Sequence, residues 1–352
     1  MPDGATPQSH SQKAMPTEKN ENSVVEAYGS QKCPKLVSQI EQTTNLTLRN
    51  NALKVLCEEV RNPYSAGGVV KSHVIPILNE LTVKADDKLT RELASKALSA
   101  MAIDSNGRAS MIETKTCEMV IKGLDDESPV VRENVYTALL NLSAIHNGVV
   151  ALVDSSYPKL LCEKSNMEID DVRHLPLSLL YNCIKVDEGL QQALACSAVE
   201  VCIDNLSHAT QAVRKASAST LGFLCFADSA KVAAIQNDAV AKLSVLLDDG
   251  NWNVRANAAG ALMSIIQTDA GKKAIVPAGI VPKLIRLLKD VEPLVKINVL
   301  KVISCAAVHP EARKEMRESG DCLPVIKVII EEGDDLLKRH AEVAKEAVLW
   351  QP

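Results

Sequence analysis

Residues capable of acid–base, nucleophilic or metal chemistry occur throughout this 352-residue chain, but without the spacing that such chemistry requires. The ten cysteines include no CxxC pair, and no two cysteines or histidines have zinc-finger spacing. A Gly-rich phosphate loop, a nucleophile elbow and an HExxH motif are all missing. The sequence therefore predicts a protein without catalytic residues, metal ligands, cofactors or a small-molecule substrate.

The cysteines, histidines and acidic runs have simpler interpretations. Four cysteines lie in segments that we predict to be helical, where a thiol packs as a small apolar group: Cys57, Cys183, Cys225 and Cys305. The seven histidines fall mostly in predicted loops or at helix starts, as expected of surface residues. Acidic runs such as Asp125-Asp126-Glu127 and Asp248-Asp249 lack the ligand series of a calcium loop. We interpret them as solvated turns whose acids lie near a helix N-terminus.

Composition and charge exclude several classes of partner. The net charge is −5, with acids and bases mixed along the chain, whereas nucleic-acid binding needs a basic face. No N-terminal segment resembles a signal peptide, and no apolar run approaches the roughly 20 residues of a membrane span. We therefore expect a cytoplasmic protein with reduced thiols that binds neither nucleic acid nor membrane.

A period of 41 residues organises most of the chain. Its first marker is a basic residue, often preceded by valine, that recurs every 41 or 42 residues: Arg49, Arg91, Arg132, Arg173, Arg214, Arg255, Lys296 and Lys338. A second marker is a small residue on the same grid: Gly107, Gly148, Gly189, Ala230, Gly271 and Ala312. Proline precedes several basic markers by 14 or 15 residues: Pro34, Pro76, Pro158, Pro282 and Pro324. Three markers in phase indicate a tandem repeat.

Each repeat is predicted to contain three helices. Positions 3, 6, 7 and 10 after the basic marker are apolar or small, as in Val135, Ala138, Leu139 and Leu142. These steps place the side chains on one face of a helix. An amphipathic segment such as 280–290, and before it a short glycine-bounded segment such as 271–279, complete the repeat. One repeat cannot bury its apolar face alone, so the repeats must stack into an all-α solenoid.

The grid also predicts the domain organisation. Residues 1–30 are predicted to form a disordered tail. Residues 1–23 are rich in Pro, Ser, Gln, Lys and Asn and contain no Val, Leu, Ile or aromatic residue, so they cannot bury enough apolar surface to fold. The repeat array is predicted over 31–352, with a truncated first repeat at 31–65. The later repeats are predicted to start at residues 66, 107, 148, 189, 230, 271 and 312.

The repeats resemble those of the armadillo family. The segment "AIVPAGIVPKLIRLLKD" (274–290) followed by "VKINVLKVISCAA" is similar to the armadillo consensus, and "VYTALLNLSA" (135–144) resembles its third helix. The resemblance covers residues 31–352 and implies a right-handed α-α superhelix of about eight repeats. The short first helix distinguishes this pattern from the two-helix HEAT repeat.

A narrower resemblance is to the radial spoke head 14 homologue family of motile cilia. It rests on "NAAGALM" (257–263), on "AYG" (27–29), and on the length and number of repeats. The resemblance implies a non-catalytic structural scaffold of the axoneme radial spoke, located in the cilium or flagellum and binding other spoke proteins. The alternative is a soluble peptide-binding adaptor of the import or catenin type.

Armadillo import adaptors bind extended peptides through asparagines on their third helices, each with a tryptophan four residues earlier. The corresponding position here lies nine residues after the basic marker, where Asn141 and Asn182 are the only asparagines and Ser264 is a further polar residue. Thr137 and Ser178 replace the tryptophans, which disfavours the import function. Asn141 and Asn182 remain candidates for gripping one short extended segment, or are simply solvated polar residues.

The chain's only phenylalanines, Phe223 and Phe226, share one helix face in the same frame. They either point toward the groove as an apolar anchor for a partner or are buried by a local rotation of their repeat. Trp350 is expected to cap the last repeat. Pro176 predicts either a helix that begins near His174 or a kink, with a surface ion pair between Arg173 and Asp170-Asp171.

Overall fold

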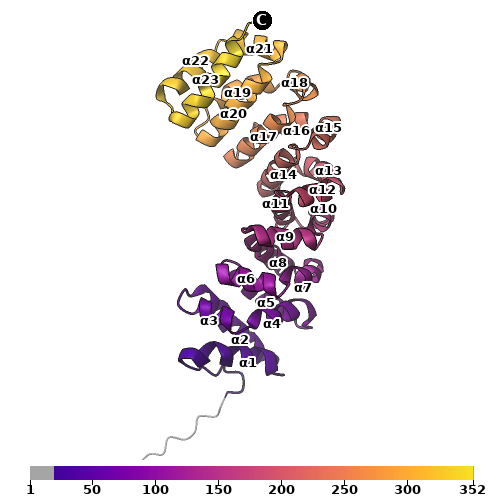
Figure 1. The fold of residues 1–352 in the computed structure, drawn as a ribbon, viewed down its shortest axis with the longest axis vertical. Helices are drawn as coiled ribbons and strands as arrows, with labels where there is room; N and C mark the ends of the chain where they lie inside the picture. Colours follow the sequence, from indigo (N-terminus) through magenta and orange to yellow (C-terminus); the bar gives the residue numbers. More distant parts are fainter. Residues whose placement is uncertain (1–19, 352) are drawn as a thin grey trace, which may run out of the picture. The chain divides into compact units, whose positions relative to one another are not determined.

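The computed structural model describes residues 20–351, and every regular element within them is helical (Figure 1). This confirms the predicted all-α class. The chain divides into two compact bodies, Met1–Val74 and Ile75–Pro352, which are described separately below. None of the helices in residues 20–351 combines the length and apolar content needed to cross a bilayer.

The first body contains one short 3-10 helix and three α-helices: η1 (Gly29–Gln31), α1 (Lys32–Gln42), α2 (Leu46–Arg61) and α3 (Ala66–Lys71). Ile40, Leu53 and Leu56 have no exposed surface and form its core. Arg49, the first basic marker, donates from Nε to the Ile40 carbonyl at 3.1 Å. The marker therefore joins the start of α2 to the end of α1.

Residues 1–19 of the predicted tail lie outside the described residues, whereas residues 20–28 form no helix and run beside α1 and α2. The Gln39 side chain accepts from the Val25 amide at 2.8 Å and donates to the Val25 carbonyl at 2.9 Å. Asn51 donates to the Asn22 carbonyl at 3.0 Å. This part of the predicted tail is thus hydrogen-bonded to the first helices.

The second body is built from three-helix repeats. Short first helices open the repeats; those in this body are α6 (Ser105–Glu113), α9 (His146–Asp154), α12 (Asp187–Leu194), α15 (Asp228–Gln236), α18 (Asp269–Ile275) and α21 (Pro310–Glu318). They begin two residues before the corresponding positions of the predicted grid.

Second helices follow, and the one after α6 is split into an α and a 3-10 segment. They are α4 (Val74–Lys84), α7 (Thr116–Val120) with η2 (Ile121–Asp125), α10 (Tyr157–Met167), α13 (Ala198–Asn205), α16 (Ala239–Leu246), α19 (Ile280–Leu287) and α22 (Cys322–Glu332). The third helices are α5 (Lys88–Met101), α8 (Pro129–Leu142), α11 (His174–Cys183), α14 (Gln211–Leu224), α17 (Trp252–Ile265), α20 (Pro293–Ala306) and α23 (Asp335–Leu349).

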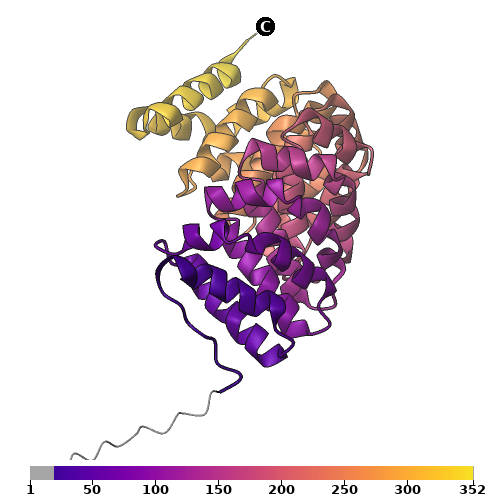
Figure 2. The ribbon, with the colours of Figure 1, turned by 60° about the horizontal axis from the view of Figure 1, so that its bottom comes forward.

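The third helices stack on one another in chain order, α5 on α8 and so on to α23. In both views the repeats of this body succeed one another in the order of the sequence (Figures 1 and 2). The predicted inward positions are buried, since Val135, Ala138, Leu139 and Leu142 are at most 2% exposed. Burial of this apolar stripe contributes to the driving force for folding and stacking of the repeats.

Glycines on the 41-residue grid lie where a first helix crosses the end of the preceding third helix. A Cβ on Gly189 would overlap the Cys183 carbonyl oxygen and would lie 2.9 Å from its carbonyl carbon and 3.0 Å from Val153 Cγ2. Gly148 meets the Leu142 carbonyl in the same way. These glycines are required by close approach of backbones and not by a special backbone conformation.

The basic markers form a ladder between consecutive repeats. Four of these arginines donate from Nε to a buried carboxylate in the turn before the next third helix. The pairs are Arg91–Asp126 at 2.6 Å, Arg132–Glu168 at 2.9 Å, Arg214–Asp249 at 2.7 Å and Arg255–Asp290 at 2.8 Å. The carboxylate side chains are only 3–8% exposed. The interpretation of the acidic runs as solvated was therefore wrong for Asp126 and Asp249, which the preceding repeat covers, whereas the neighbouring Asp125 and Glu127 side chains are 69% and 78% exposed.

The neighbouring acid in two of these turns binds the other adjacent repeat. Asp125 pairs with Lys164 on α10, and Asp248 pairs with Lys283 at 2.9 Å and with Arg286, both on α19. Each of these acidic runs thus ties its repeat to both neighbours. In these two turns, the adjacent acids therefore have separate partners on either side.

The fourth predicted repeat departs from the ladder. The expected ion pair between Arg173 and Asp170-Asp171 was wrong: Arg173 donates to the Glu168 carbonyl at 2.8 Å, and Asp170 lies 3.3 Å from Nε2 of His208. His208 occupies the position of the ladder carboxylates. Its Nδ1 accepts from the Thr210 amide at 3.0 Å, as Asp249 accepts from Asn251. The helix α11 begins at His174, the first of the two outcomes expected from Pro176.

Candidate functional site

The layer of third helices carries the predicted partner-binding residues. Asn141 is half-buried and donates to the Ser99 carbonyl at 3.4 Å. Asn182 donates to Ser143 Oγ at 2.8 Å, and its Oδ1 accepts from the Lys185 ammonium at 2.8 Å. Both amides therefore hold the preceding repeat, and a peptide would have to displace these contacts. The geometry does not favour an asparagine ladder.

The three hydroxyl residues of the predicted site are turned toward their own helices. Thr137 and Ser178 each donate to the carbonyl four residues earlier, at 2.8 and 2.7 Å. Ser264 is only 2% exposed, because α17 packs between α14 and α20. Ser264 cannot contact a partner without local opening. Its inclusion in the predicted binding surface was therefore wrong.

Phe223 and Phe226 are brought together at the end of α14. Their rings lie 5.1 Å apart at 87°, an edge-to-face arrangement. Phe226 is 56% exposed and Phe223 is half-buried. The sequence left two alternatives for these rings. The structure excludes the one in which both rings are buried in the core.

A third ring belongs to the same cluster and was missed from the sequence. Tyr181 on α11 lies 5.6 Å from Phe223 at 79°, so an aromatic pair bridges two consecutive repeats. Lys185 lies 4.5 Å above the Tyr181 ring, and desolvation lowers the pKa of its ammonium. We call Tyr181, Lys185, Phe223 and Phe226 the aromatic cluster. The signal available in the sequence was that Tyr181 precedes Phe223 by about one period.

The cluster suits an apolar or aromatic side chain of a partner. Rings exposed at a surface gain by being covered, at roughly 25 cal/mol per Å² of apolar area removed from water. The helices α11 and α14 contain no acidic residue, so neither helix supplies a carboxylate that could neutralise the Lys185 ammonium. Aromatic residues are enriched at the centres of protein interfaces.

Catalytic or metal chemistry finds little support in the described part of the chain. Residues 20–351 contain no group of three or more His, Cys, Asp or Glu placed to hold a metal ion. Burial raises the pKa of four interior thiols to about 12: Cys117, Cys162, Cys183 and Cys225. These thiols remain protonated at neutral pH, so none of them has the thiolate character of an enzyme's primary nucleophile.

Trp350 behaves differently from a buried cap. Its side chain is 56% exposed, with the Arg313 guanidinium 4.8 Å from the ring centroid. Arg317 donates to the Val348 carbonyl at 2.6 Å. The two arginines of α21 therefore hold the end of α23 through a cation–π contact and a backbone hydrogen bond.

Comparison with known proteins supports the fold alone. No protein-family model matches the chain. An engineered protein from the Northeast Structural Genomics Consortium is similar in structure, with a TM-score of 0.82 at 22% identity over 91% of this chain and 79% of that one. A designed armadillo repeat protein is 20% identical, with a TM-score of 0.49 over 78% of this chain and 99% of that one.

The stacked three-helix repeats define the class of the protein: an armadillo-like repeat solenoid. Solenoids present extended surfaces, and this architecture is typical of protein-binding scaffolds. The aromatic cluster is the feature of this chain that fits such a role.

Proposed function

We propose that the protein is a non-catalytic scaffold that binds another protein through the aromatic cluster, and that it serves in the radial spoke of the ciliary or flagellar axoneme. The observation that carries the binding proposal is the exposed Phe226 ring, continuous with Phe223 and Tyr181 across two repeats. The partner would place an apolar side chain on these rings. The location in the cilium rests on the sequence resemblance alone.

Replacement of both phenylalanines by serine is expected to weaken partner binding by at least about tenfold, because truncation of a central aromatic residue commonly costs 2 kcal/mol or more. The measurement is the fraction of tagged protein that stays with detergent-extracted axonemes in ciliated cells, with cross-linking and mass spectrometry to identify the neighbour. Phe226→Ser alone should show most of the effect without disturbing the fold, since this ring is largely exposed.

A matched control is Val245→Ser, which removes an exposed apolar side chain from α16, outside the third-helix layer. It should leave retention unchanged. Equal retention of the phenylalanine variants and wild type would exclude the cluster as the anchor while leaving the ciliary role standing. Wild-type protein that washes out with detergent and occurs in non-ciliated cells would instead indicate a soluble adaptor.

A further inference from the structure

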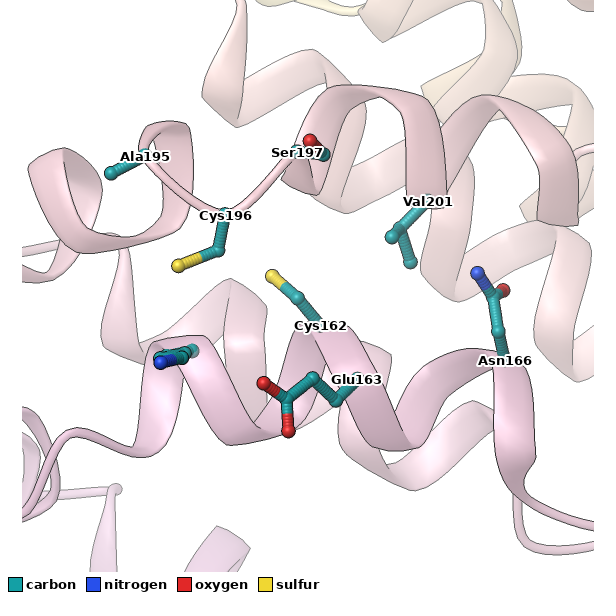
Figure 3. Close-up of a pocket in the computed structure, with 8 residues that line it drawn as sticks. Cys162, Glu163, Asn166, Ala195, Cys196, Ser197 and Val201 are labelled. Atoms are coloured by element: carbon teal, nitrogen blue, oxygen red, sulfur yellow. The ribbon is translucent and has the colours of Figure 1, made fainter.

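A pocket of about 430 Å³ lies between α10 and the turn that joins α12 to α13. Two cysteines from consecutive repeats line it, Cys162 on α10 and Cys196 in the turn, and both side chains enter the gap between these two elements (Figure 3). Both are free thiols. Cys162 is 3% exposed, whereas Cys196 is half-buried and opens to the pocket.

The turn that carries Cys196 is fixed. Its amide donates to the Ala193 carbonyl at 3.0 Å, and the next residue, Ser197, has a left-handed backbone with φ of 56°. Non-glycine residues hold this conformation only when their surroundings impose it. The Cys196 side chain is therefore presented to α10 by a defined backbone and not by a mobile loop.

The corresponding positions of later repeats are in contact. Two periods later, Cys162 corresponds to Ser244 and Cys196 to Ala278, and Ser244 Oγ donates to the Ala278 carbonyl at 2.9 Å. The neighbouring repeats carry Ile121 and Ile203 in place of Cys162. The departures from the repeat pattern at Cys162 and Cys196 therefore place two thiols at one junction between repeats.

We propose that Cys162 and Cys196 form an oxidative modification site, in which hydrogen peroxide converts the two thiols into a disulfide that joins the two consecutive repeats. This inference does not depend on the proposed function. Other interior cysteines, such as Cys202 and Cys183, are completely buried and have no opening to an oxidant.

The chemistry is balanced with peroxide as the two-electron oxidant. Cys196, the more accessible sulfur, attacks one peroxide oxygen as its thiolate, the O–O bond breaks, and the leaving hydroxide takes up a proton to become water. Cys162 then attacks the resulting sulfenic sulfur, and the hydroxyl leaves with the Cys162 proton as a second water. Burial raises the pKa of Cys162 to about 12, so its thiol does not compete for peroxide, and its slower attack depends on the sulfenic sulfur being held beside it. Two thiols and one peroxide yield one disulfide and two waters.

The test is peptide mapping of the folded full-length protein after treatment with one equivalent of hydrogen peroxide. Wild type should lose two of its ten thiols and yield a linked pair of tryptic peptides, 160–164 and 186–214. Because 186–214 contains both Cys196 and Cys202, a second cleavage after Glu200 is needed to assign the bond. Dithiothreitol should reverse the loss.

Three variants complete the experiment. Cys162→Ala and Cys196→Ala should each abolish the linked peptide, whereas Cys305→Ala, which removes a half-buried thiol on α20, should not. The proposal is overturned if folded wild type keeps all ten thiols, if the bond maps to Cys202, or if Cys196 is oxidised to sulfinic acid while Cys162 stays free.

Discussion

Replacing Gly189 with alanine is expected to lower the free energy of unfolding by roughly 2 kcal/mol. The added Cβ would overlap the Cys183 carbonyl and press on Val153, so α12 has to move away from the end of α11. Overpacking of this kind usually costs about 1–3 kcal/mol, and the better helix propensity of alanine offsets up to ~1 kcal/mol of it. Urea denaturation followed by circular dichroism measures the change.

A matched control comes from a glycine that lies in a helix without a close neighbour. Gly260 is inside α17, and a Cβ there would have Asn298 Nδ2 at 3.6 Å as its nearest outside atom. Gly260→Ala should therefore leave the unfolding free energy unchanged or raise it by up to ~1 kcal/mol. A Gly189→Ala protein as stable as wild type would show that the first helix can shift freely, and that this position tolerates alanine as the repeats with Ala230 and Ala312 do.

The repeat architecture was predictable because its markers are themselves inter-repeat contacts. The recurring arginine is one partner of the ladder, and the glycine on the same grid is the point of closest backbone approach. Where they occur, both lie at a fixed place in the repeat, so the contact geometry appears in the sequence as a period. The inward positions of the third helix follow from the 3.6-residue periodicity of a helix for the same reason.

The candidate site was less predictable because it depends on the relative rotation of adjacent helices. Phe223 and Phe226 could be placed on one face from their spacing, but whether that face is exposed is decided by how α14 packs on α11. Tyr181 belongs to the preceding repeat, and its contact with Phe223 arises only from stacking. Ser264 has the same offset as Phe223 yet is buried, so an offset within the repeat does not determine exposure.

The acidic turns illustrate a related difficulty. A run of two or three acids before a helix is typical of a solvated turn, and nothing local in the sequence distinguishes Asp248 from Asp249. In the structure Asp249 has a side chain 7% exposed beside Arg214, while Asp248 is 41% exposed. The difference arises because the two side chains face opposite neighbours, and only the arginine of the preceding repeat covers its partner.

This difference leads to the second prediction, that Asp249→Asn lowers the free energy of unfolding by about 2–3 kcal/mol. The asparagine oxygen can still accept from the Asn251 amide, so the substitution removes mainly the charge. It leaves the Arg214 guanidinium, 19% exposed, without its carboxylate. The arginine keeps only its bonds to the His208 and Ala209 carbonyls, which do not neutralise it.

Asp248→Asn is the matched control in the adjacent position. Its pairs with Lys283 and Arg286 are partly exposed, so the expected loss is under about 1 kcal/mol. Hydrogen exchange across α14 and α17 should show the Asp249→Asn effect at the junction between these two repeats, because the ladder acts between neighbours. Equal losses from the two substitutions would mean that burial of the carboxylate is not what makes the ladder stabilising, and that the third helices are held in register by apolar packing alone.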